Sequence, residues 1–150
     1  MAHSYSRCLF HCVFSTKGRA QSIAGDVQGQ LWAYIGGVAR TNGVTALAVC
    51  GTADHAHVLL SLPATIPIAK AVQLIKAGSS KWLRETFATM TGFAWQEGYG
   101  AFSIGTAEVD DTLRYIANQA VHHRTRSFEE EYRAFLQRHG IVFDDRYTLG

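Results

Sequence analysis

The residues most suggestive of chemistry are two histidines, His55 and His57, that lie two positions apart. They occur in HAHVLLSL (55–62), which has the alternating pattern of a β-strand. Because side chains at i and i+2 share one face of a strand, both imidazoles can converge on one metal ion. Two partly exposed histidines that hydrogen-bond to their neighbours would give the same pattern, so the pair alone leaves both interpretations open.

A second group of polar residues follows the spacing of a helix. Tyr115, Gln119 and His122 are four and three residues apart, so a helix would place them on one face. A solvated helix face would show the same pattern. A tyrosine with a pKa of about 10 attacks a phosphodiester effectively only if a divalent ion polarises the phosphate. Two imidazoles and the Gln119 carboxamide oxygen would form a neutral three-ligand site for that ion.

The predicted elements that position these residues follow the order β-α-β-β-α-β and end in two more helices. This is an α+β fold of the ferredoxin-like, split β-α-β type, with two helices on one face of an antiparallel sheet and further C-terminal helices. The other face of the sheet is expected to be available for function. We predict a single domain over 1–150, strands at 5–14, 44–50, 55–62 and 93–104, a tyrosine helix at about 110–123 and a C-terminal helix at about 128–139.

The overall charge is only a weak indication of nucleic-acid binding. Fourteen Lys and Arg against twelve Asp and Glu give a formal net charge of +2. The basic residues outnumber the acidic ones by eight to four in residues 1–100, whereas residues 101–150 contain six basic and eight acidic residues. The small net charge therefore combines a basic segment, residues 1–100, with an acidic C-terminal third.

Composition also limits the class of protein. No apolar run approaches the roughly 18 residues that cross a membrane, and the N-terminus has no export signal. Three cysteines suit free thiols in a reducing compartment. Cys8 and Cys12 with His11 could suggest zinc, but His11 points to the opposite face of the predicted strand, so core cysteines are the better interpretation. We expect a cytoplasmic protein that does not associate with membranes.

A resemblance to a known family rests on two segments, DHAHVLL (54–60) and YIANQAVHH (115–123). Together they resemble the single-tyrosine transposases of bacterial insertion sequences and their domesticated, repeat-associated relatives, which belong to the HUH endonuclease superfamily. Four further segments agree in the same order: FHCVFSTKGR (10–19), LIKAGSSKWLR (74–84), WQEGYGAFS (95–103) and SFEEEYRAFLQRHGI (127–141). The resemblance therefore spans nearly the whole chain.

The resemblance implies a role for each matching residue. Tyr115 would be the nucleophile that cleaves single-stranded DNA, leaving a 5′-phosphotyrosine and a free 3′-OH that allow later rejoining. His55, His57 and Gln119 would hold Mg²⁺ or Mn²⁺, and His122 would be an auxiliary residue that orients phosphate or caps the helix. The implied partners are DNA hairpins at element ends and a second copy of the chain in a homodimer. The cations expected to contact DNA phosphates are Lys17, Arg19, Lys76, Lys81 and Arg84.

Two other functions remain compatible with the residues. A non-catalytic module for single-stranded nucleic acid could use the same aromatic and basic residues for stacking and phosphate contact. A small metal-dependent hydrolase could use water in place of the tyrosine. Among rival nucleophiles, Tyr132 lies on an apolar stripe and is expected in the core, whereas Tyr99 is expected to pack or to stack on a base.

Overall fold

The computed structural model describes residues 3–119 and 127–144 and confirms the α+β fold, with a four-stranded antiparallel sheet in the order β2-β3-β1-β4. The elements are β1 (Cys8–Ser15), α1 (Gly25–Thr41), β2 (Thr45–Gly51), β3 (His55–Leu62), α2 (Ile68–Thr86), β4 (Gly100–Ile104), α3 (Val109–Ala117) and α5 (Phe128–Arg138). Three short 3-10 turns, η1 (Lys17–Arg19), η2 (Ala88–Met90) and η3 (Thr106–Glu108), connect them. In the described ranges, no helix is both long and apolar enough to cross a membrane.

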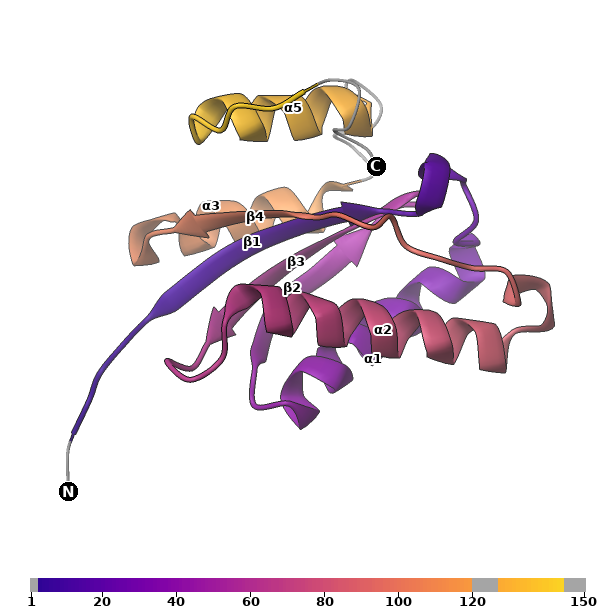
Figure 1. Cartoon of the computed structure of the whole chain (residues 1–150), viewed down its shortest axis with the longest axis horizontal. Helices are drawn as coiled ribbons and strands as arrows, with labels where there is room; N and C mark the ends of the chain where they lie inside the picture. The colour runs from indigo at the N-terminus through magenta and orange to yellow at the C-terminus, as the bar shows by residue number, and fades with distance from the viewer. Residues whose placement is uncertain (1–2, 120–126, 145–150) are drawn as a thin grey trace.

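Helices α1 and α2 cover one face of the sheet, as the sequence predicts (Figure 1). Ala56, Val58 and Leu60 of β3 face these helices and are fully buried. Cys12 and Phe14 of β1 enter the same core. The alternation along β1 and β3 therefore gives each strand one face in this main core and an opposite face on the other side of the sheet.

The opposite face, which the sequence pattern predicts to be available for function, is covered by α3 and α5 (Figure 1). The apolar stripe of α5 must be buried and finds its partners on β1 and β4. This second core consists of Val13, Phe102, Phe128, Tyr132, Phe135 and Leu136. Any site on this face of the sheet is therefore enclosed between strands and helices.

The strand predicted at 93–104 is wrong in its first half. Only Gly100–Ile104 pairs with β1, and Trp95 makes a single isolated bridge to Thr16. Trp95 turns into the main core instead of continuing the ladder. Gly100 marks the close approach suggested by the glycines of this segment, because a Cβ there would lie 2.6 Å from Cε2 of Tyr132.

Two other boundaries also differ. β1 begins at Cys8, three residues later than predicted, and Tyr5 is exposed. α3 ends at Ala117, where the backbone of its C-cap, Asn118, leaves the helical region although the Asn118 amide still bonds the carbonyls of Arg114 and Tyr115. Residues 120–123 of the predicted tyrosine helix, including His122, fall outside the described residues. α5 begins at its N-cap Ser127, whose hydroxyl accepts a hydrogen bond from the Glu130 amide.

Candidate functional site

His55 and His57 lie side by side on the face of β3 that α3 and α5 cover. Both side chains are fully buried, and their ring centroids are 5.2 Å apart. Phe128 of α5 stacks on the His55 ring. The predicted convergence of the two imidazoles is therefore present, in an interior position.

Glu131 of α5 completes a group that could hold a metal ion. Its Oε1 lies 2.7 Å from Nε2 of His57, and the side chain is 1% exposed. One ligand atom from each of His55, His57 and Glu131 lies within 4.8 Å of the other two. A buried carboxylate requires a partner of opposite charge, and two imidazoles with a carboxylate are a common ligand set for divalent ions.

Gln119 brings a further oxygen to the same place. Its Oε1 is 3.2 Å from Nε2 of His55, while its amide nitrogen donates to the carbonyl of Tyr115. On the other side of the ring, Nδ1 of His55 lies 2.8 Å from Oδ1 of Asp54 and 2.9 Å from the Thr52 hydroxyl. Asp54 thus favours a proton on Nδ1, as carboxylates do beside metal-binding histidines.

Whether these residues fit a cation depends on the lone pairs that they direct toward one another. With its proton on Nδ1, His55 presents the Nε2 lone pair to the lone pairs of Gln119 Oε1. Two acceptors at this distance repel unless a proton or a cation lies between them. A divalent ion bound by these groups and by Glu131 would satisfy the lone pairs and offset the buried carboxylate charge, so the donor set fits a metal.

His11 lies behind His57, in a place that sequence reasoning did not assign to the site. Its Nε2 is 2.7 Å from Nδ1 of His57, and its side chain is 3% exposed. Burial, followed by the neighbouring His57, holds the pKa of His11 well below its ordinary value. Cys12 faces the main core, where burial raises the pKa of its thiol to about 12. The positions of Cys12 and His11 on opposite faces of the sheet therefore disfavour the Cys–His zinc interpretation.

Tyr115 of α3 lies beside these histidines. Its ring centroid is 5.8 Å from that of His57 and 6.0 Å from that of His11. The tyrosine also lines a cavity of about 470 Å³ bounded by β4, α3 and α5. A second cavity of about 30 Å³, the volume of one water, is lined by Tyr115 and Glu131. The phenol therefore adjoins both the metal-ligand group and a space that could admit substrate.

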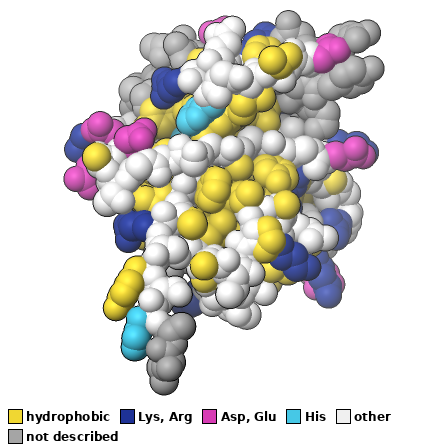
Figure 2. Space-filling view, turned by 60° about the vertical axis from the view of Figure 1, so that its left-hand side comes forward, with side chains coloured by type: hydrophobic (Ala, Val, Ile, Leu, Met, Phe, Trp, Pro, Cys, Tyr) yellow, Lys and Arg dark blue, Asp and Glu magenta, His cyan; other side chains and the backbone are white. Residues whose placement is uncertain are grey.

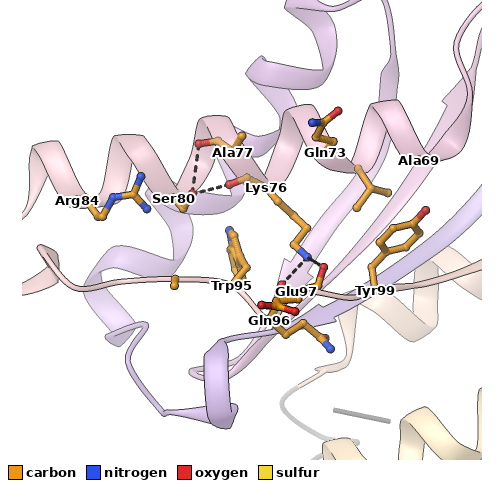
Figure 3. A pocket seen from close by; sticks show the side chains of 12 residues that line it. Ala69, Gln73, Lys76, Ala77, Ser80, Arg84, Trp95, Gln96, Glu97 and Tyr99 are labelled. Carbon is orange, nitrogen blue, oxygen red and sulfur yellow. Dashed lines mark hydrogen bonds between the residues drawn. The ribbon is translucent and has the colours of Figure 1, made fainter. Parts of the chain in front are cut away.

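The rival tyrosines lie elsewhere. Tyr132 is 5% exposed in the second core, where burial raises the pKa of its hydroxyl. Tyr99 lines a different cavity of about 390 Å³ between α2 and the segment 94–99 (Figure 3). Of these three tyrosines, Tyr115 alone lies beside the histidines.

The predicted phosphate-contacting cations do not gather around Tyr115. Lys76, Lys81 and Arg84 belong to α2, on the opposite face of the sheet. Lys17 and Arg19 form the turn after β1, near the end of the sheet that carries His55. Lys17 is exposed, whereas Arg19 pairs with Glu129 of α5 at 3.4 Å.

Lys76 and Arg84, both labelled in Figure 3, contact backbone carbonyls of the segment 93–98. The half-buried ammonium of Lys76 donates to the carbonyls of Gln96, Glu97 and Gly98 at 2.6, 3.3 and 2.8 Å. Burial also lowers its pKa. Arg84 donates to the carbonyl of Phe93 at 3.2 Å. These contacts connect α2 to the segment that leads into β4.

Sequence reasoning missed Glu131 and the role of His11. The signal for Glu131 was its position three residues after Phe128 and four before Phe135, which places a carboxylate on the apolar stripe of α5. The signal for His11 was its place on the same strand face as Leu9 and Val13, away from the cysteines. Its contact with His57 becomes evident only once β1 is known to pair with β3.

Comparison with known proteins gives a consistent result. The family described as "Transposase IS200 like" matches residues 4–119. The transposases for insertion sequence element IS200 from Salmonella typhimurium LT2 and from Salmonella typhi are each 26% identical to this chain over 122 residues, covering 77% of this chain and 80% of the relative.

Two solved structures share the fold. A candidate transposase from Deinococcus radiodurans R1 has a TM-score of 0.63 and 22% identity, covering 79% of this chain and 96% of that chain. A REP-associated tyrosine transposase bound to a REP hairpin has a TM-score of 0.61 and 17% identity, covering 82% of this chain and 73% of that chain.

The carbonyl contacts of Lys76 generate a stability prediction. Lys76→Met keeps the aliphatic stem but removes the ammonium, so the free energy of unfolding in urea should fall by about 1–2 kcal/mol. Amide hydrogen exchange at 96–98 should become faster. Lys81→Met, on the exposed side of the same helix, should change stability by less than about 0.5 kcal/mol. Equal losses in the two variants would contradict this structural role for Lys76.

Proposed function

Because this chain belongs to the IS200-like transposase family, we propose that it cleaves and rejoins single-stranded DNA through a covalent tyrosine intermediate. DNA transposition is the function of the family. The observation that supports this chemistry most directly is the placement of Tyr115 beside His55, His57 and Glu131, next to a cavity of about 470 Å³.

In the proposed reaction, Tyr115 is the nucleophile. Its oxygen forms a bond to phosphorus as the bond from phosphorus to the 3′ oxygen breaks. The tyrosine hydroxyl gives up its proton and the departing 3′ oxygen takes one up, so the products are a 5′-phosphotyrosine and a 3′-OH. A second 3′-OH can reverse the step without an external energy source, because the phosphotyrosine retains a phosphodiester bond.

We propose that His55 and His57 hold Mg²⁺ or Mn²⁺ together with the oxygen ligands Glu131 and Gln119. When bound, the ion would polarise the phosphate and stabilise charge on its oxygens. Asp54 orients His55 through Nδ1, which directs Nε2 toward Gln119. Phe128 and Phe135 pack against the histidine rings and limit access of water to them.

DNA binding in this proposal relies on dispersed cations. Figure 2 shows hydrophobic side chains gathered near the centre of one face, with basic and acidic side chains scattered around them, in keeping with the net charge of +2. Lys17 and Arg19 are the best-placed phosphate contacts, because they lie near the end of the sheet that carries His55. Lys81 and Arg84 would contact DNA that extends to α2, whereas the Lys76 ammonium is already bonded to three carbonyls.

A covalent-adduct assay tests the nucleophile. Protein mixed with Mg²⁺ and single-stranded DNA from either side of its own gene should yield a protein–DNA species that survives a denaturing gel. Tyr115→Phe should abolish this species, because it removes the attacking oxygen, whereas Tyr99→Phe should retain it. Binding without an adduct by the unmodified protein would favour a non-catalytic module, and cleavage that survives Tyr115→Phe would favour a hydrolase that uses water.

Calorimetric titration with Mn²⁺ tests the ligands. His57→Ala should weaken Mn²⁺ binding by at least about tenfold relative to the unmodified protein. The Mn²⁺ affinities of Glu131→Gln and Gln119→Ala would compare the contributions of the two oxygen donors to ion binding. His3→Ala removes an exposed histidine and should leave affinity unchanged. Undiminished binding by a folded His57→Ala protein would contradict the assignment.

We also propose a homodimer that binds DNA hairpins. Family membership supports this proposal, and the REP-associated neighbour was solved with a REP hairpin. In sedimentation velocity, the protein should sediment as a species with twice the 16.5 kDa mass of one chain. Its sedimentation coefficient should rise further when a hairpin oligonucleotide is added. A fully active species of 16.5 kDa would contradict the dimer.

A further inference from the structure

We propose that His11 is a positioning residue for His57. In this arrangement, Nε2 of His11 accepts a hydrogen bond from Nδ1–H of His57, so that the Nε2 lone pair of His57 faces the metal ion. This inference rests on the metal site proposed above. It concerns a residue outside the His-x-His pair, on a different strand, that makes no direct contact with the ion in the proposed arrangement.

The contact is short, buried and sterically confined. Nε2 of His11 lies 2.7 Å from Nδ1 of His57, and both rings are almost entirely excluded from solvent. The His11 ring meets Phe135 edge-on, with centroids 5.0 Å apart and an interplanar angle of 88°. Tyr115 approaches it at 71°. These aromatic neighbours restrict rotation of His11 away from His57.

The hydrogen bond couples the tautomer of His57 to that of His11. Two neutral imidazole nitrogens at this distance share one proton, which belongs either to Nδ1 of His57 or to Nε2 of His11. If His57 carries the proton on Nδ1, its Nε2 lone pair is directed toward Glu131 and can bind a cation. If His11 carries the shared proton, a neutral His57 has its own proton on Nε2, which then donates to Glu131. Metal binding therefore selects the arrangement in which His11 is the acceptor.

Each of the two site histidines has a hydrogen-bond partner at Nδ1, and the two partners differ in their chemistry. His55 is backed at Nδ1 by the Asp54 carboxylate, whereas His57 is backed at Nδ1 by an imidazole. Partners at this position fix ring orientation and tautomer in metal sites, and their loss costs about 10- to 100-fold in metal affinity. A neutral acceptor at His57 performs this task without adding a second negative charge beside buried Glu131.

Metal affinity of variants tests the role of His11. His11→Leu keeps a buried apolar side chain but removes the acceptor, and should weaken Mn²⁺ binding by about 10- to 100-fold in calorimetric titration. His11→Gln supplies an amide oxygen as acceptor and should recover most of the affinity. Leu9→Ala, which disturbs packing on the same face of β1, should leave affinity within about threefold of the unmodified protein.

Nitrogen NMR gives a readout that does not depend on activity or on a folded variant. In the unmodified protein saturated with Mg²⁺, ¹⁵N-labelled His57 should show a protonated Nδ1. A protonated Nε2 would overturn the inference, as would full Mn²⁺ affinity in His11→Leu or equal losses in His11→Leu and His11→Gln.

If the unmodified protein binds no Mn²⁺, the proposed metal site itself fails and this inference fails with it. Tight Mn²⁺ binding that is insensitive to His11 would reject only the inference.

Discussion

The buried contact between His57 and Glu131 is the constraint on which the site depends. A carboxylate that is 1% exposed must be balanced by positive charge or by hydrogen bonds, and here its neighbour is an imidazole at 2.7 Å. Because Glu131 comes from α5 and His57 from β3, this requirement holds the helix to the sheet at one defined position. The apolar stripe of α5 supplies most of the burial, and the polar contact fixes where along the sheet that stripe docks.

The enclosure has chemical consequences. Charges interact more strongly away from water, so an ion held by these groups would act on a phosphate with little screening. The same enclosure requires that every polar atom in the site be matched, which explains the partners behind each histidine. Tyr115 differs from these residues in being only half-buried and in lining a cavity, which suits its proposed role as the group that meets an external substrate.

Much of the fold could be predicted from local patterns. Alternation in HAHVLLSL predicted β3 with its observed bounds, and it placed Ala56 and Val58 in the main core. Contacts between distant segments could not be predicted in this way. Glu131 resembled one of several acids at a helix N-terminus, where negative charge is common. The second core was missed because helical periodicity shows that a stripe must be buried but not which face of the sheet buries it. The end of α3 at Ala117, where the backbone of Asn118 leaves the helical region, was not evident from a run of residues that all tolerate a helix.

The origin of Glu131 in the last described helix has a consequence for biosynthesis. A nascent chain that has emerged from the ribosome through β4 already contains all four strands and both helices of the main core. At that stage the face of β3 that carries His55 and His57 has no cover, and the ligand group lacks its carboxylate. The group formed by His55, His57 and Glu131 is therefore completed only when α5 docks, after all four strands of the sheet have been synthesised.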